Sequence, residues 1–529
     1  MPSELVLMFL LLATSGFLLL AYRTRVPYPM WLVVGGAVLG FLPPVPNAAL
    51  GPELVLVLLL PPLLYSAAFF SSVRDLRDSA RPIFSLAFGL VLLTVAGVAV
   101  IGHMVIGLSW EVAFVLGAVV SPTDPVAATA IGRRVGAPAR VITIVEGESL
   151  INDSTALVAY KYAIAAAVTG GFHFISAAGE FAVDVAGGVA IGLLAGWITA
   201  QIARRVEDAP TEILLSLLVP FFAYLPAEAI DVSAVLAAVS AGLYLGTQAP
   251  RLLTPSTRIQ LYSVWEILVF GINTTLFLLV GLELPHVLDG ISGWAPATLV
   301  GYSAALIGGV LGLRIVWVFV VAYRPRFLRK NAHRPPWRPV ALVAWNGMRG
   351  AVSLATALAI PLAIEGGAPF PGRDLIIFLV YVTILATVLG QGLTLPWLIR
   401  RLGLAGVGEA REKAAESAAR LAAMDAALDR LEEMRDEDWV PEPIRERMTR
   451  LYEGRRRVIA ARVEPGVAEE TDMFGGEMLD AATRIREELQ LTQRERITEL
   501  RDSGRINDET LRRIEHDLDL EDARLEQLP

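Results

Sequence analysis

The sequence predicts an all-α polytopic membrane protein with about 13 transmembrane helices and a helical cytoplasmic tail. Its 529 residues are 54% hydrophobic and 19% charged, with a mean hydropathy of +0.56, which is too apolar for an ordinary soluble protein. Apolar segments of about 20 residues, enough to cross a bilayer core of roughly 30 Å, recur up to residue 402. The net charge is +3 over residues 1–402 and −11 over residues 403–529.

The predicted spans follow one another with mostly short loops between them. The first has no positive charge before its apolar run and no clear cleavage site, so we expect an uncleaved helix rather than a signal peptide. The two short segments, 27–43 and 232–248, carry the weakest signal. The spans are 4–22, 27–43, 52–71, 82–107, 111–132, 139–169, 176–203, 211–229, 232–248, 259–284, 293–323, 338–361 and 374–400.

Lysine and arginine residues in the loops predict the orientation of the chain. Loops that follow odd-numbered spans hold eighteen of these residues, whereas loops that follow even-numbered spans hold only Arg373. Cytoplasmic loops carry the excess of positive charge. The N-terminus is therefore expected outside and the C-terminal tail in the cytoplasm.

We divide the chain into a transmembrane domain, residues 1–402, and a cytoplasmic tail, residues 403–529. In the tail, apolar residues recur at helical spacing among dense charges at 409–437, 442–462, 468–501 and 505–527. This pattern fits a solvated helical bundle, and it also fits a dimerising or regulatory module.

Composition argues against several other kinds of protein. The chain has no cysteine, which excludes disulfides and thiolate metal sites, and its five histidines show no metal-ligand spacing. No nucleophile–base pair, metal cluster or phosphate-binding loop is recognisable, so we expect neither an enzyme nor a bound cofactor. The acidic tail argues against nucleic-acid binding, which requires a basic surface.

The fifth span is interrupted by the sequence Ser121-Pro122-Thr123-Asp124-Pro125. Each proline lacks an N–H and disfavours helix at the residue before it, so the helix should unwind here. The freed carbonyl groups can ligate a cation, and the ends of the two half-helices point their dipoles at the break. The alternative is a simple proline kink with Asp124 as a helix cap.

The sixth span contains the sequence Glu-Gly-Glu-Ser-Leu-Ile-Asn-Asp at residues 146–153. On a helix, Glu148 lies one turn from Asn152, and Ser149 lies one turn from Asp153. Ionisable residues inside a membrane are costly and are functional candidates by default. Oxygen ligands of this kind suit a small alkali cation, whereas Glu146 points away and is given no ligand role.

Two arginines extend the candidate set. Arg314 lies in the middle of the eleventh span, where a buried guanidinium needs a carboxylate partner. Arg349 lies in a glycine-interrupted part of the twelfth span. The interrupted fifth and twelfth spans occupy corresponding places in the two halves, which indicates inverted repeats, two broken crossing helices and a site at the bilayer midplane. Lys161, farther along the sixth span, is expected to extend its side chain to the interface.

Three motifs in this order resemble those of bacterial Na+/H+ antiporters of the monovalent cation–proton antiporter superfamily, in the branch that includes the sodium–proton exchangers. They are Ser-Pro-Thr-Asp-Pro-Val-Ala (121–127), Glu-Gly-Glu-Ser-Leu-Ile-Asn-Asp (146–153) and Asn-Gly-Met-Arg-Gly-Ala-Val-Ser (346–353). The resemblance covers residues 1–402, and tail residues 500–509 also look like those of bacterial members.

The resemblance implies roles for the residues of the cation site. Asp153 would bind the cation or a proton, and Ser149 and the backbone carbonyl of Thr123 would be further Na+ ligands. Asp124 would act through water or by compensating the helix break. Asn152, which precedes Asp153 where a second Asp would be the alternative, resembles the electroneutral branch.

The resemblance also implies two structural roles and reveals one departure. Glu148 would form a buried ion pair with Arg314, and Arg349 would steady the break in the twelfth span. Members of the family often have Asp or Glu in the third span after a Leu-Pro-Pro sequence, but here Ser66 takes that position. A hydroxyl ligand in place of a carboxylate leaves the preference for Na+ over K+ open.

The resulting hypothesis is secondary active antiport of Na+, or of K+, against H+, with one carboxylate shared between cation and proton. Spans four to six and eleven to thirteen would move, by an elevator type of alternating access, against a static group that forms a homodimer interface. The resemblance implies a bacterial inner-membrane protein that regulates internal pH and sodium. The alternatives are a channel or sensor on the same fold and an antiporter for K+ or an organic anion.

Overall fold

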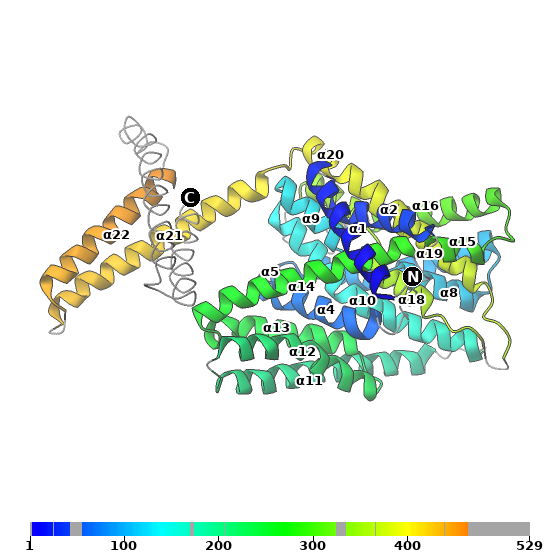
Figure 1. Cartoon of the computed structure of the whole chain (residues 1–529), viewed down its shortest axis with the longest axis horizontal. Helices are drawn as coiled ribbons and strands as arrows, with labels where there is room; N and C mark the ends of the chain where they lie inside the picture. The colour runs from blue at the N-terminus through cyan, green and yellow to red at the C-terminus, as the bar shows by residue number, and fades with distance from the viewer. Residues whose placement is uncertain are drawn as a thin grey trace. The chain divides into compact units, whose positions relative to one another are not determined.

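The computed structural model describes residues 3–24, 26–42, 55–169, 174–206, 208–323, 335–364, 367–437 and 440–463. The regular secondary structure of these residues is helical, apart from one isolated β-bridge between Ala363 and Pro369 (Figure 1). The chain divides into two compact units, Met1–Glu409 and Ala410–Pro529. The apolar helices belong to the first unit.

Each predicted span coincides with helical residues, and several spans consist of consecutive helical pieces. Among the described residues, six helical stretches are long and apolar enough to cross a membrane, and five further apolar helices are shorter. The chain is therefore an all-helical, multi-pass membrane protein, whereas the count of 13 crossings stays a prediction. The short helices α5 and α15 lie in predicted loops. The elements are α1 (Ser3–Thr24), α2 (Tyr28–Gly40), η1 (Val55–Leu59), α4 (Leu60–Phe69), α5 (Val73–Asp78), α6 (Ala80–Phe84), η2 (Ser85–Leu90), α7 (Val91–Ile101), η3 (Gly102–Ile106), α8 (Trp110–Val120), α9 (Val126–Val135), α10 (Ala139–Thr169), α11 (Phe174–Ala203), α12 (Ala209–Ala229), α13 (Ala234–Leu252), α14 (Pro255–Leu282), α15 (Leu284–Gly290), α16 (Pro296–Ala322), α17 (Trp337–Trp345), α18 (Ala351–Leu358), α19 (Arg373–Leu385), η5 (Ala386–Gln391) and α20 (Gly392–Arg401).

The outer surface of the first unit is apolar, as a lipid-facing surface must be. Leu12 of α1, Ile267 of α14 and Val300 of α16 are 65%, 73% and 68% exposed. In water such side chains would form an aggregation-prone patch, whereas in lipid they meet acyl chains at no cost. The helices satisfy their own backbone hydrogen bonds, which is what allows these segments to face hydrocarbon.

Two hydrophobic clusters organise the first unit. One contains residues of α7–α10 and α16–α20, together with residues of α2 and the second half of α14. We call α7–α10 with α16–α20 the broken-helix bundle, because α8/α9 and α17/α18 are interrupted spans. The other joins α4, α12, α13 and the first half of α14 with Ala200 of α11, and Leu150 of α10 packs into it. We call α4, α11, α12, α13 and the first half of α14 the straight-helix bundle. Helices α11, α12 and α13 lie side by side in Figure 1.

Lys161 of α10 joins the two bundles. Its Nζ atom lies 2.8 Å from Asp231 Oδ1, in the turn between α12 and α13, and 3.9 Å from Asp184 Oδ2 of α11. Sequence reasoning gave Lys161 only a path to the interface and missed these partners, because they come from helices that are remote in sequence. Among the described residues of the first unit, two ion pairs connect the two bundles, and Lys161 forms both of them.

The described part of the second unit is a pair of charged helices. Helix α21 (Val407–Glu433) continues through the short turn η6 (Met434–Asp436), and α22 (Glu442–Val463) follows. Arg456 of α22 lies 2.5 Å from Asp425 of α21, so the two helices lie side by side. The first two predicted tail helices thus occur, whereas 468–501 and 505–527 lie outside the described residues. The dimerising or regulatory role of the tail stays a prediction.

Candidate cation-binding site

The fifth predicted span is broken where its two prolines stand. Helix α8 ends at Val120, the residues of 121–125 are not regular helix, and α9 begins at Val126. Asp124 Oδ1 accepts a hydrogen bond of 2.8 Å from the backbone N–H of Val126, in the first turn of α9. Asp124 therefore compensates the freed donors of the second half-helix, and the carbonyl groups before the break are left for other partners.

The twelfth predicted span is broken in the same way, and its break crosses the first. Helix α17 ends at Trp345 and α18 begins at Ala351, with residues 346–350 extended between them. The backbone N–H of Asp124 donates to the carbonyl oxygen of Met348 at 2.8 Å. A Cβ atom on Gly350 would lie 1.9 Å from Asp124 Oδ2, so the crossing leaves no room for a side chain there. The two predicted helix breaks are thus in direct contact with each other.

Arg349 binds both breaks. It is 2% exposed, its Nε donates to the carbonyl oxygen of Val120 at 3.1 Å, and its Nη1 donates to the carbonyl oxygen of Gly347. Its own backbone N–H donates to Thr387 Oγ1 at 3.0 Å. We expected Arg349 to steady only the break in its own span. The guanidinium also donates a hydrogen bond to a free carbonyl group in the last turn of α8.

Thr123 is the meeting point of the break and α10. Ser149 Oγ donates to the backbone carbonyl of Thr123 at 2.8 Å, and Asn152 Nδ2 donates to Thr123 Oγ1 at 2.7 Å. Thr123 Oγ1 in turn donates to Glu148 Oε1 at 3.3 Å. All four residues are at least nine-tenths buried. The Asn152 Oδ1 atom has no hydrogen-bond partner among the described residues, so the cluster retains an acceptor for a further group.

Glu148 and Arg314 form a bidentate ion pair inside the broken-helix bundle. Arg314 Nη1 lies 2.5 Å from Glu148 Oε1, and Arg314 Nη2 lies 2.9 Å from Glu148 Oε2. Each residue is 1% exposed, and Arg314 Nη2 also donates to the carbonyl of Val343 at 3.2 Å. Such a pair compensates the desolvation of both charges only with good geometry and extra hydrogen bonds, and both are present.

Asp153 and Ser66 are not hydrogen-bonded to this cluster. Asp153 is 7% exposed, and its side chain makes neither a hydrogen bond nor an ion pair with the described residues. Ser66 of α4 is 3% exposed and donates to the carbonyl of Leu63 at 2.9 Å, which is a bond within its own helix. A buried carboxylate without a partner favours a proton or a cation as its neighbour.

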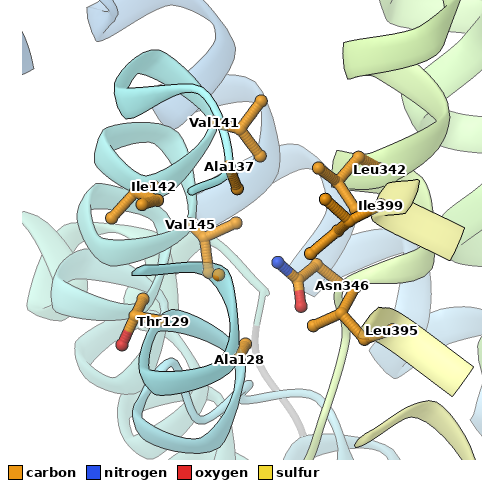
Figure 2. Close-up of a pocket in the computed structure, with 11 residues that line it drawn as sticks. Ala128, Thr129, Ala137, Val141, Ile142, Val145, Leu342, Asn346, Leu395 and Ile399 are labelled. Carbon is orange, nitrogen blue, oxygen red and sulfur yellow. The ribbon is translucent and has the colours of Figure 1, made fainter. Parts of the chain in front are cut away.

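Three further residues belong to the surroundings of the site. Thr387 accepts a hydrogen bond from the backbone N–H of Arg349. The sequence feature that could have indicated this role is a polar residue within the apolar thirteenth span. Asn346, at the end of α17, points into a small cavity between α9 and α10 on one side and α17 and α20 on the other (Figure 2). Its Oδ1 atom has no partner among the described residues. Glu146, given no ligand role, forms an ion pair of 2.8 Å with Arg133 at the end of α9.

Known proteins resemble this chain along most of its length. The family profile described as "Sodium/hydrogen exchanger, transmembrane" matches residues 7–401. A Mycobacterium tuberculosis protein named as an uncharacterised Na+/H+ exchanger, Rv2287, is 36% identical over 515 residues, which are 96% of this chain and 93% of that protein. The Bacillus subtilis sodium, potassium, lithium and rubidium/H+ antiporter is 34% identical over 386 residues, 70% of this chain and 58% of that protein.

The fold has a counterpart among solved structures. The sodium proton antiporter MjNhaP1 from Methanocaldococcus jannaschii superimposes with a TM-score of 0.59 and 20% sequence identity. The match covers 76% of this chain and 99% of that one. At this level of identity, the likeness concerns the fold alone.

Proposed function

Because this chain belongs to the transmembrane sodium/hydrogen exchanger family, we propose that it exchanges a monovalent cation for protons across a bacterial inner membrane. The family consists of transporters and not of enzymes. Na+ is the first expected cation, since several similar proteins are named for Na+/H+ exchange. K+ is the second, because the Bacillus subtilis relative is named for several alkali cations.

The observation that carries the proposal is the convergence of α10 on the broken helix. Ser149 bonds the carbonyl of Thr123, and Asp153 lies one turn farther along the same helix. A cation bound to that carbonyl would replace the hydrogen bond from Ser149. The hydroxyl could then rotate so that the lone pairs of Ser149 Oγ face the same ion. The carbonyl, the hydroxyl and the Asp153 carboxylate are hard oxygen donors, which suit an alkali cation.

Asp153 is the group that couples the two fluxes in this proposal. Proton and cation compete for one carboxylate, so that the site is neutralised by either but not by both. An ionised carboxylate without a bound cation or proton is costly in a low-dielectric environment. The unloaded site would therefore move slowly between the two sides of the membrane. Asp124 and Arg349 keep the two broken helices in register, and Glu148 with Arg314 holds α10 to α16.

The proposed cycle is an elevator type of alternating access. The broken-helix bundle moves against the straight-helix bundle, which forms the interface of a homodimer. One cation is exchanged for one proton, because Asn152 stands where a second carboxylate would add charge. The N-terminus is outside and the tail is cytoplasmic, as the loop charges predict. Such exchange would serve to regulate internal pH and sodium.

The test is fluorescence dequenching of a pH-sensitive dye in proteoliposomes on addition of Na+ and then K+. The wild-type protein is expected to respond, and Asp153→Ala is expected to abolish the response. Asp374→Ala is the matched control, because the Asp374 side chain is 61% exposed. Exchange that survives Asp153→Ala would contradict the residue assignment. A folded wild-type protein that dissipates one ion gradient without moving a second would favour a channel.

A further inference from the structure

A second carboxylate is buried outside the broken-helix bundle. Glu212 lies in the first turn of α12 and is 4% exposed. It lines a cavity of the straight-helix bundle together with Tyr65 of α4, Thr199 of α11 and Ser216 of α12. The remaining lining residues are leucine, alanine and phenylalanine side chains. The cavity thus has one acidic group, three hydroxyls and apolar walls.

The described residues do not neutralise Glu212. The Thr257 hydroxyl lies beside the carboxylate, but the Oε2 atom has no hydrogen-bond partner among the described residues. No lysine, arginine or histidine is among the residues that line the cavity. The N-terminus of α12 supplies only a partial positive charge. A buried carboxylate with so little compensation requires a proton or a cation beside it.

The hydroxyl groups around Glu212 are placed to act as oxygen ligands. The Tyr65 side chain is fully buried, and its hydroxyl lies beside Ser216 without forming a hydrogen bond of regular geometry. Ser216 lies one turn after Glu212 and accepts a hydrogen bond of 3.0 Å from Trp265 Nε1, which leaves a lone pair for another contact. Thr199 Oγ1 donates to the carbonyl of Ala195 at 2.9 Å, so that its lone pairs are likewise available.

We propose that Glu212, Ser216, Tyr65 and Thr199 form a second site for a monovalent alkali cation, separate from Asp153. One carboxylate with neutral oxygen donors balances one positive charge, whereas a divalent cation would demand more acidic ligands. Helix α12 begins after a loop that holds Arg204 and Arg205 and is expected to be cytoplasmic. The site therefore binds the cation from the cytoplasmic side.

Trp265 supplies the measurement, because it is fully buried and bonded to Ser216. Purified full-length protein is titrated with NaCl or KCl while choline chloride keeps the ionic strength constant. The difference in tryptophan emission between the wild type and Trp265→Phe isolates the contribution of Trp265. We expect a saturable change with the alkali cation, a loss of affinity of at least tenfold in Glu212→Gln, and an unchanged response in Asp153→Asn.

The matched control is Glu228→Gln, since Glu228 lies exposed on the same helix. It should respond like the wild type. If Glu212→Gln does not fold, Tyr65→Phe decides, because it removes only the hydroxyl and should weaken binding severalfold. A wild-type response in Glu212→Gln or, failing that variant, in Tyr65→Phe overturns the proposal, as does a response that disappears in Asp153→Asn. The measurement records binding in detergent, so its outcome is independent of whether the protein exchanges cations for protons.

Discussion

Asp124 and Met348 are joined by a backbone hydrogen bond of 2.8 Å, from the N–H of Asp124 to the carbonyl oxygen of Met348. This bond links the break in α8/α9 directly to the break in α17/α18. Because it involves no side chain, it fixes how the two extended segments align. The residues that flank it are therefore sensitive to small changes in volume or charge.

Gly350→Ala should disrupt the crossing of the two breaks. The added Cβ atom would meet Asp124 Oδ2 at 1.9 Å, a contact that real Cβ atoms do not make, so the Asp124 side chain or one of the two segments must shift. We expect exchange in proteoliposomes to fall at least about tenfold, since a displacement of about 1 Å can cost that much or more. Gly308→Ala in α16 is the control, because a Cβ atom there has nothing within 4 Å. Equal activity of the two variants would contradict the steric argument.

Arg314→Met should destabilise the protein more than it changes ion preference. Removing one partner of a buried ion pair leaves the other charge uncompensated, at a cost of about 3–5 kcal/mol in the free energy of unfolding. Thermal unfolding in detergent measures this loss. Glu148→Leu added to Arg314→Met should recover much of it, because no buried charge then remains.

Arg133→Gln is the comparison for the buried pair. Arg133 pairs with Glu146 at a similar distance, but its side chain is 66% exposed. Its loss should cost only about 0–1 kcal/mol, as exposed pairs do. If Arg314→Met and Arg133→Gln lowered the free energy of unfolding by similar amounts, burial would not determine how much each ion pair contributes to stability.

Ser149→Ala should weaken cation binding without unfolding the protein. The variant removes both the hydrogen bond to the Thr123 carbonyl and one proposed ligand oxygen. The half-saturating cation concentration for exchange should rise about tenfold, which corresponds to about 1.4 kcal/mol. Ser154→Ala is the control on the same helix, since Ser154 Oγ is buried but bonds no described residue. An unchanged half-saturating concentration in Ser149→Ala would remove Ser149 from the ligand set.

Asn152→Asp should make exchange respond to the membrane potential. The wild type is expected to run at the same rate whether or not a potential is imposed across the vesicle, because one charge is exchanged for one. A second carboxylate beside Asp153 adds a charge to the loaded site, and a potential of about 100 mV then contributes about 2.3 kcal/mol per charge. A potential-dependent wild type, or a variant without such dependence, would refute the role given to Asn152.

Lys161→Met should alter exchange with little effect on stability. The Lys161 and Asp231 side chains are 45% and 85% exposed, so the pair contributes about 1 kcal/mol or less to the free energy of unfolding. If the two bundles move past one another, loss of this link should still change the exchange rate severalfold. Lys161→Arg, which keeps the positive charge, should preserve the rate. A rate unaffected by Lys161→Met would mean that these groups stay together throughout exchange.

Local sequence patterns were enough to predict the helices and the places where they break. Hydropathy located the apolar segments, and Pro122 and Pro125 predicted the end of α8, because a missing N–H acts on the nearest turn of its own chain. Helical periodicity likewise predicted that Glu148 and Asn152 share a face. The resemblance to known antiporters added the pairing of Glu148 with Arg314, which no local pattern contains.

The contacts between residues that are distant in sequence could be found only from the packing of the helices. Arg349 reaches the carbonyl of Val120 across 229 positions of sequence, and Arg314 reaches Glu148 across 166. The partners of Lys161 and the hydroxyls around Glu212 come from separate helices in the same way. The physical reason is that periodicity and proline chemistry act within a few turns of one helix, whereas these contacts depend on how whole helices pack against one another.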